Sequence, residues 1–410
     1  MLRPLPAVVR SPVGLAWLTL LAATGLLFVL GNYRLIDGGK DFQLRYREAQ
    51  YVLQGIDPFR IASEQLAPSP EIGPLIKEAG QPPWVYTYCV IAFGWLTENQ
   101  AKLALGVFNA AVLAWILIGA HRRLQPFQSS ESSLCLLPLG GLFCTVYLIN
   151  AVSLANFDFW ICALCWLFIA AEQRGFRLPA GALFGLMMIK PTLVVCLGFW
   201  FLRQRRFVGL SIAVGLVLGA WFAASQLLSM PMLDLLSQMS AKGSEFSRPV
   251  DIGMAAPFLQ YGLGDAQSVV KVYMLLGFAV AAVALTLYHK AEPAAVLGWV
   301  LTVGQAFFYS RHNSYVTFSI LFFQMAVLMS RTPVTLRTKV IFALTFLAFA
   351  TPGFRGLYAQ TPLLGIAEVL RYSALLAGAL LVLRESHHYR RTTENPTPAR
   401  AAAPVAQAVT

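Results

Sequence analysis

Long apolar runs separated by short polar connections make up most of this chain. Such runs recur from residue 15 to residue 383, and a helix needs about 20 mainly apolar residues to cross a hydrocarbon core of about 30 Å. Counting whole runs gives about twelve candidate spans, which predicts an all-α polytopic membrane protein with about 11–13 transmembrane or half-spanning helices. The runs lie near residues 15–30, 84–96, 103–120, 134–149, 157–171, 179–202, 207–228, 272–288, 294–308, 315–329, 340–350 and 363–383.

Two of these runs are unusual. Residues 84–96 are short for a span, and residues 179–202 are interrupted by Lys190-Pro191. Basic residues test whether the two runs cross, because Lys and Arg collect in cytoplasmic connections. With a cytoplasmic N-terminus, as Arg3 and Arg10 indicate, a single crossing by every run leaves two basic clusters outside. If the first run does not fully cross and the second folds back at Lys190, every basic cluster falls inside, and we favour this topology.

The predicted fold-back puts Lys190 inside the membrane. Half-helices of ~12 residues reach only ~18 Å, so their tip stops short of the far side of the hydrocarbon core. Such a tip is tolerated where it lines a protein-walled cavity. In this topology the loop at Asp41, the tip, residues 230–265 and the turn at Arg311-His312 all face the non-cytoplasmic side.

Composition supports a membrane protein without a separate soluble domain. Of the 410 residues, 57% are hydrophobic and 12% are charged, whereas soluble domains have about 25% charged residues. We expect a single membrane domain over residues 1–383, starting with a retained signal-anchor helix, with a first loop at 32–83 that carries short helices and a second at 229–266. Residues 384–410, basic and then rich in Pro, Ala and Thr, are expected to form a disordered cytoplasmic tail. The net charge of +12 lies in short connections, which indicates topology rather than nucleic-acid binding.

Neither a metal nor a cofactor is expected. Cys162 and Cys165 have a metal-like spacing, but no second pair or nearby His accompanies them, so packing is the favoured interpretation. The chain has no credible Walker loop, Rossmann fingerprint, HExxH or GxSxG motif. These absences disfavour nucleotide-driven transport and metalloprotease chemistry.

The polar stretch at residues 37–59 carries the first candidate chemistry. Asp41 follows two glycines and opens a helical segment in which Arg45 falls on the same face. The Asp41 carboxylate is either an N-cap or a general base for an acceptor hydroxyl, and Arg45 would help to keep it ionised. Asp57 precedes a proline, as at an ordinary helix start. Tyr46 could stack on a sugar ring, although aromatic residues also gather at membrane interfaces, which is the favoured interpretation.

Lys190 is the sharpest single candidate. It is a lone cation in an apolar run, and isolated burial of a charge costs ~2.5–3.5 kcal/mol on insertion scales. A bound phosphate would compensate this charge, whereas the structural alternative is a lysine that snorkels from a helix end.

Two further polar breaks interrupt the apolar pattern. In the segment 309–315, Arg311 could hold a phosphate with two hydrogen bonds and His312 could act as an acid or base; the alternative is an interface anchor. Asn156 and Asp158 form the other break, in an aromatic setting.

Short motifs in consistent order between residues 15 and 329 resemble a known family. They are Asp41-Phe42 with Tyr46 and Ala49, Leu53 to Phe59, Pro82-Pro83, Ala180-Gly181 through Lys190-Pro191-Thr192 to the basic cluster at 203–206, and the polar turn from His312 to Tyr315. Together they resemble glycosyltransferase family 87, within the GT-C superfamily of polytopic glycosyltransferases.

The resemblance implies transfer of a hexose, with mannose favoured, from a polyprenyl-phosphate carrier. The acceptor would be a hydroxyl of a glycan or glycolipid at the outer face of a bacterial plasma (inner) membrane. By this resemblance Asp41 is the general base, Lys190 and Arg311 meet the donor phosphate, and His312 is a second acid–base candidate. Weaker substrate-binding candidates are Arg45, Tyr46, Asp57, Asn156, Asp158 and Tyr315.

A single carboxylate suits direct displacement with inversion, without a metal. The main alternative is a polytopic transporter or lipid flippase, since these proteins also use intramembrane charge and broken helices. A transporter often has two related halves, but the second half of this chain shows no repeat of the Lys190-Pro191 or Asp41 pattern.

Overall fold

The computed structural model describes residues 22, 25–35, 40–75, 82–87, 91–124, 148, 152, 157–245, 253–255, 257–258, 261–262, 264–308, 314–331, 335–350 and 364–394. These residues form helices and no strands, which confirms the all-α prediction. The helices are α3 (Lys40–Leu53), α4 (Pro58–Ala62), α5 (Pro83–Val85), α6 (Ile91–Gly94), α7 (Glu98–Leu124), α10 (Asp158–Gln173), α11 (Arg177–Met187), α12 (Pro191–Val194), α13 (Leu197–Arg203), α14 (Phe207–Leu227), α15 (Met232–Glu245), η5 (Gly253–Ala255), α17 (Ala266–Leu287), α18 (Pro293–Phe307), α19 (Ser314–Arg331), α20 (Leu336–Ala350) and α22 (Leu364–Glu394).

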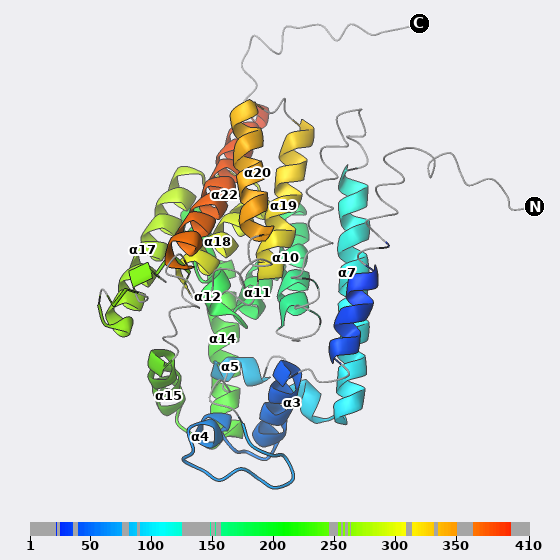
Figure 1. Cartoon of the computed structure of the whole chain (residues 1–410), viewed down its shortest axis with the longest axis vertical. Helices are drawn as coiled ribbons and strands as arrows, with labels where there is room; N and C mark the ends of the chain where they lie inside the picture. The colour runs from blue at the N-terminus through cyan, green and yellow to red at the C-terminus, as the bar shows by residue number, and fades with distance from the viewer. Residues whose placement is uncertain are drawn as a thin grey trace, which may run out of the picture.

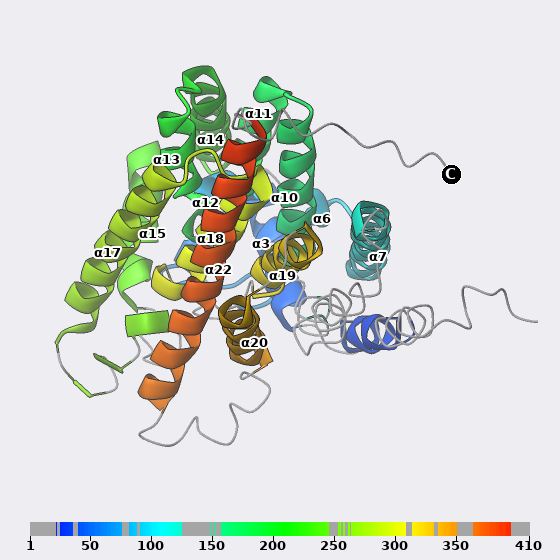
Figure 2. The same ribbon diagram turned by 90° about the horizontal axis from the view of Figure 1, so that it is seen from above.

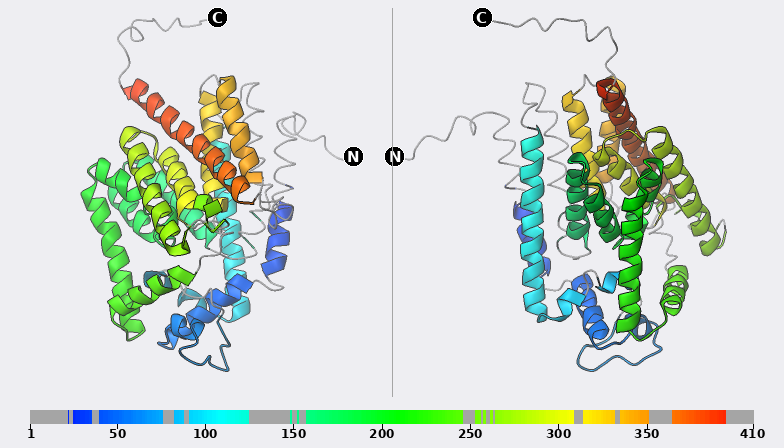
Figure 3. Two further views of the ribbon diagram at one scale, coloured as in Figure 1. Left: turned by 60° about the vertical axis from the view of Figure 1, so that its left-hand side comes forward. Right: turned by 180° about the vertical axis from the view of Figure 1, so that it is seen from behind.

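The long helices form a bundle around α18. Most of them run along the long axis of the molecule, while α3, α4, α5 and α15 gather at one end (Figure 1). All 15 residues of α18 are buried, because α10, α12, α17, α19 and α22 pack around it (Figure 2). Figure 3 shows from two further sides that α3 and α15 lie at the end opposite to the last turns of α22.

Three helices of the described chain are long and apolar enough to cross a membrane. They cover Phe207–Leu227, Ser268–Leu287 and Gly365–Thr392. The first of these exposes Val214, Leu218 and Phe222, as expected of a helix whose outer face meets lipid. The shorter apolar helices Pro293–Phe307 and Tyr315–Met329 coincide with predicted runs.

The segment around Lys190 folds back, as predicted. A Cβ added at Gly181 in α11 would lie 2.5 Å from the Gly209 carbonyl oxygen in α14, and one added at Gly185 would lie 3.0 Å from the Ala213 Cα. A step of four residues along α11 corresponds to a step of four residues in the same direction along α14, so the two helices are parallel neighbours. Their backbones meet through small residues, as in many membrane helix pairs. The chain between them, with α12 and α13, therefore has to return to the end from which α11 started.

The run at residues 84–96 is described in two pieces, on either side of residues 88–90. In its described part α5 has three residues and α6 has four. The Thr87 hydroxyl donates to the Ala220 carbonyl oxygen in α14 at 3.1 Å, and Gly94 accepts a hydrogen bond from Gln50 in α3 at 3.0 Å. Both pieces thus pack at the α3 end of the bundle, which supports the prediction that this run does not fully cross.

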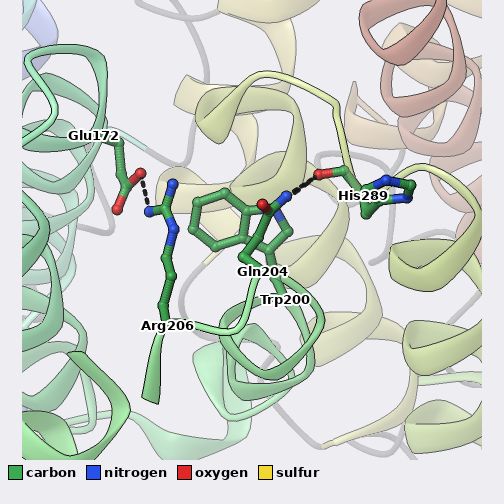
Figure 4. A network of polar contacts seen from close by, with 5 residues as sticks. All are labelled: Glu172, Trp200, Gln204, Arg206 and His289. Carbon is green, nitrogen blue, oxygen red and sulfur yellow. Dashed lines mark hydrogen bonds and ion pairs between the residues drawn. The ribbon is translucent and has the colours of Figure 1, made fainter. Parts of the chain in front are cut away.

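Away from the α3 end, a network of polar contacts links several connections between helices that carry basic residues (Figure 4). Arg206, just before α14, donates to Glu172 near the end of α10. The Arg206 guanidinium also lies 4.6 Å from the centroid of the Trp200 ring. Gln204 and Trp200 both donate to the carbonyl oxygen of His289, between α17 and α18. This network places three predicted basic connections side by side.

Residues 384–394, predicted to belong to a disordered tail, are helical. α22 continues through them and is held to the connection before α18. The Ser386 hydroxyl accepts a hydrogen bond from the Glu292 N–H at 2.9 Å, and His387 Nδ1 accepts one from the Lys290 N–H at 3.3 Å. These contacts give the first part of the predicted tail a fixed helical conformation, which corrects the prediction there.

Candidate functional site

One hydrophobic cluster joins the elements that carry the candidate residues. It contains Phe42 of α3, Trp84 of α5, Phe157 before α10 and Ile189 at the fold-back tip. These four residues come from segments far apart in the sequence, yet they pack together at one end of the bundle. The cluster therefore brings the backbone positions next to Asp41, Asp158 and Lys190 into one region.

Asp41 lies inside α3, one residue after Lys40, rather than at the residue that precedes the helix. The backbone thus does not support the N-cap alternative, while the Asp41 side chain lies outside the described part of the chain. Because Phe42 and Ala49 face the shared cluster, the first turn of α3 borders this region.

A buried ion pair follows Asp41 on α3. Arg45 Nη1 lies 2.5 Å from Glu48 Oε2, and the Glu48 side chain is fully buried. Glu48 falls seven residues after Asp41 and three after Arg45, so all three share a helix face. That spacing was visible in the sequence, but its burial depends on how α3 packs, and Glu48 was not among the predicted site residues.

Other polar residues of α3 hold the neighbouring helices. The Tyr46 hydroxyl donates to the Leu96 carbonyl oxygen at 2.9 Å, which supports a structural role for Tyr46. Gln43 donates to Glu98 at 3.4 Å. The Glu98 carboxyl, at the start of α7, also pairs with Lys102 at 2.8 Å, and this hydrogen bond is the main reason that the pKa of Glu98 lies below its ordinary value.

Asp57 caps α4. Its side chain accepts a hydrogen bond from the Phe59 N–H at 3.0 Å, and Pro58 is at the first helical position. The residues after it, Ile61 and Ala62, pack in a separate cluster with Leu44 and other residues of α3. The predicted helix start is confirmed, and this geometry favours a structural role for Asp57.

The fold-back tip is fixed from two sides. Trp84 Nε1 donates to the Met188 carbonyl oxygen at 2.8 Å. On the other side α12 rests on α18, where a Cβ added at Gly304 would lie 2.7 Å from the Thr192 carbonyl oxygen. Lys190 is half-buried between these contacts and directly precedes α12. A rigid tip of this kind gives the lysine a defined position.

Asp158 and Tyr315 come together although 157 residues separate them in the sequence. Asp158 is buried at the first position of α10, and the Phe159 ring lies 5.4 Å from the Tyr315 ring, centroid to centroid. The residue before, Phe157, has a left-handed backbone with φ 59°. Such a conformation is strained for a bulky residue, and backbone strain of this kind clusters at functional sites.

Three predicted site residues lie outside the described residues: Asn156, Arg311 and His312. The ends of α18 and α19 that flank Arg311 and His312 are described, and they lie against α12 through Gly304 and against α10 through Tyr315. Cys162 and Cys165 are buried among packed side chains: Cys162 Sγ lies 3.3 Å from the Ser319 hydroxyl, and Cys165 contacts Met187.

The architecture and the site together define a class, that of polytopic α-helical membrane proteins in which a fold-back tip lies beside a helix that carries a carboxylate. Within that class the chain belongs to glycosyltransferase family 87, since the sequence model of that family matches residues 82–310, more than half of the chain. The protein is therefore a membrane glycosyltransferase of GT-C type. The matched region contains Asp158 and Lys190, whereas Asp41 precedes it and Arg311 follows it. Comparisons with curated proteins and with solved structures gave no match.

Proposed function

We propose that this glycosyltransferase moves a hexose, with mannose favoured, from a polyprenyl-phosphate donor to a hydroxyl of a glycan or glycolipid acceptor. The observation that carries the proposal is the shared cluster that joins α3, the Lys190 tip and the start of α10. A carboxylate on α3 and a cation on a half-spanning tip would then border one site at membrane depth. This arrangement suits a lipid-linked phosphate, because the cation can meet the polar head from within the bilayer while the carboxylate serves the acceptor hydroxyl.

The proposed reaction is a direct displacement. The acceptor oxygen forms a bond to the anomeric carbon while the bond from that carbon to the phosphate oxygen breaks, with inversion. Asp41 accepts the proton of the acceptor hydroxyl, and the polyprenyl phosphate leaves with the bonding electrons. Lys190 and Arg311 stabilise the negative charge that grows on the leaving phosphate, and His312 is a second acid–base group. No metal or cofactor is assigned a role.

The basic residues at one end of the bundle indicate on which side of the membrane the proposed site lies. The connections that carry Arg174, Arg177, the cluster at 203–206 and His289-Lys290 contact one another. Lys290 is hydrogen-bonded to His387 in the last turns of α22, which lie at the end opposite α3 (Figure 3). Lys and Arg collect on the cytoplasmic side, which favours a non-cytoplasmic position for the α3 end. We propose that the acceptor is glycosylated there, at the outer face of a bacterial plasma (inner) membrane.

The test is transfer by the purified protein in proteoliposomes, with polyprenyl-phosphate mannose as donor. We expect Asp41→Asn to lower the transfer rate by about 10²–10⁴, the usual contribution of a general base. Asp234→Asn is the matched control, because Asp234 is exposed in α15 at the same end of the bundle and its loss should leave the rate unchanged.

Two results would contradict the proposal in different ways. An Asp41→Asn variant with the wild-type rate would remove Asp41 from the role of base. A wild-type protein that transfers no sugar from any polyprenyl-phosphate donor but moves a solute across the vesicle membrane would replace the proposed reaction with transport.

A further inference from the structure

Gln305 is a buried amide that has no hydrogen-bond partner among the described residues. Its side chain is 1% exposed, and this absence holds for both Oε1 and Nε2. Burial of an amide in that state is unfavourable, and nearly all buried polar side chains in proteins do have a partner. Gln305 lies within an otherwise apolar part of α18, where an apolar residue of similar size would be more stable. Its presence calls for a ligand that supplies the missing hydrogen bonds.

The position of Gln305 is next to the proposed donor site. The residue before it, Gly304, packs directly on the α12 backbone at Thr192, two residues after Lys190. Gln305 follows Gly298 by seven residues, so both lie on one face of α18. That face meets α19, since a Cβ added at Gly298 would lie 3.7 Å from the Leu321 Cα. Gln305 is therefore located between the fold-back tip and α19.

The first turn of α19 carries two more buried polar groups. Within the described part of the chain, the hydroxyls of Tyr315 and Thr317 have no hydrogen-bond partner either. α18 and α19 are consecutive and antiparallel, with Gly298 opposite Leu321, so residue 305 is level with the start of α19. The three unsatisfied side chains flank the same connection, and none of them satisfies another.

We propose that Gln305 binds the sugar ring of the lipid-linked donor, together with Thr317, which lies four residues before Leu321 and therefore on the side of α19 that faces α18. This inference rests on the proposed function and names the subsite for the sugar. An amide presents one acceptor and two donors, and a sugar hydroxyl both donates and accepts, so the two groups match. A phosphate only accepts hydrogen bonds and would leave Oε1 of Gln305 without a partner. The neutral hydroxyls are therefore the better ligand, and the cations remain for the phosphate.

Binding of two lipids by the full-length protein in nanodiscs tests the proposal. The probes are polyprenyl-phosphate mannose and the same polyprenyl phosphate without sugar. The wild type should bind the mannosylated lipid more tightly. Gln305→Leu should weaken that binding by about tenfold, the factor that two ordinary neutral hydrogen bonds represent together, and should leave binding of the sugar-free lipid unchanged.

Thr302→Val is the matched control on the same helix. Thr302 is fully buried, but its hydroxyl donates to the Gly298 carbonyl oxygen at 2.7 Å and has its partner within α18. The variant should bind both lipids as the wild type does. Gln305→Leu should also unfold at the wild-type temperature or above it, because it removes an unsatisfied buried group.

Each other outcome has a defined meaning. If Gln305→Leu keeps the full preference for the mannosylated lipid, the sugar-binding role is wrong and the proposed function stands. An equal loss for both lipids with a lower unfolding temperature would assign Gln305 to packing and overturn the inference. If the wild type binds neither lipid, the proposed function is wrong and the inference falls with it.

Discussion

The contact between Gly304 and α12 predicts that an added methyl group at residue 304 would displace the fold-back tip. A Cβ at residue 304 would lie 2.7 Å from the Thr192 carbonyl oxygen, 2.8 Å from the Leu193 Cα and 2.9 Å from the Leu193 carbonyl oxygen. All three are backbone atoms, so no side-chain rotation relieves the clash. In Gly304→Ala either α12 or α18 has to move, by roughly 0.5–1 Å to restore ordinary contact distances.

The size of the effect follows from this displacement. Overpacking of this kind usually costs about 1–3 kcal/mol, while the better helix propensity of alanine returns about 1 kcal/mol. We therefore expect a net loss of stability of about 1 kcal/mol, the middle of the resulting range of about 0–2 kcal/mol. The transfer rate should fall further, because Lys190 moves with α12 and a misplacement of about 1 Å near the reacting groups can cost ~10²-fold.

Gly298→Ala is the control for this prediction. It is the same substitution on the same helix, but its Cβ would find the nearest atom at 3.7 Å, an ordinary contact. Thermal unfolding in detergent and transfer in proteoliposomes should show a stable, active Gly298→Ala variant beside a less stable, slower Gly304→Ala variant. Equal behaviour of the two variants would refute the proposed rigid contact between α12 and α18.

Two further predictions concern the contacts around the tip and α3. Trp84→Phe removes the hydrogen bond to the Met188 carbonyl oxygen. It should lower the stability of the folded state by about 1 kcal/mol and slow transfer. Trp115→Phe, at an exposed position on α7, is the control and should change neither stability nor transfer rate. The folded-state pKa of Glu98 lies below its ordinary value of 4.5 because the carboxyl pairs with Lys102. The pair therefore stabilises the folded state above pH 4.5. This contribution is lost as the pH falls through the folded-state pKa. Unfolding at a series of pH values should show a stability difference between wild type and Lys102→Met at neutral pH that disappears in acid; a constant difference would contradict this origin.

Local signals in the sequence were enough to predict much of the fold. The charge and proline at Lys190-Pro191 interrupt an apolar run, and the basic connections only share one side if that run folds back. The proline after Asp57 predicted a helix start. Glu368 and Arg371 are three residues apart, a spacing that brings two side chains together on a helix, and they form an ion pair at 3.1 Å in α22. The helix start and the ion pair depend on neighbouring residues alone, whereas the fold-back also required the positions of the basic clusters along the whole chain.

Contacts between distant segments could not be predicted in the same way. Gly304 has an unremarkable sequence context, and only the packing of α12 on α18 gives it a role. Glu172 and Arg206 are 34 residues apart, and nothing in either segment names the other as its partner. Whether the Gln305 side chain finds a hydrogen-bond partner likewise depends on the helices packed around it. The sequence does not show this, so Gln305 was not among the sequence candidates.

The central claim is that a lipid-linked phosphate binds at the Lys190 tip. Cryo-electron microscopy of the protein in nanodiscs with added polyprenyl phosphate tests it most directly. We expect density for the phosphate within hydrogen-bond distance of Lys190 and on the side of Arg311, with the polyprenyl chain leading sideways into the bilayer. Phosphate density at the opposite, basic end, beside Arg206, with none at Lys190 would contradict the claim.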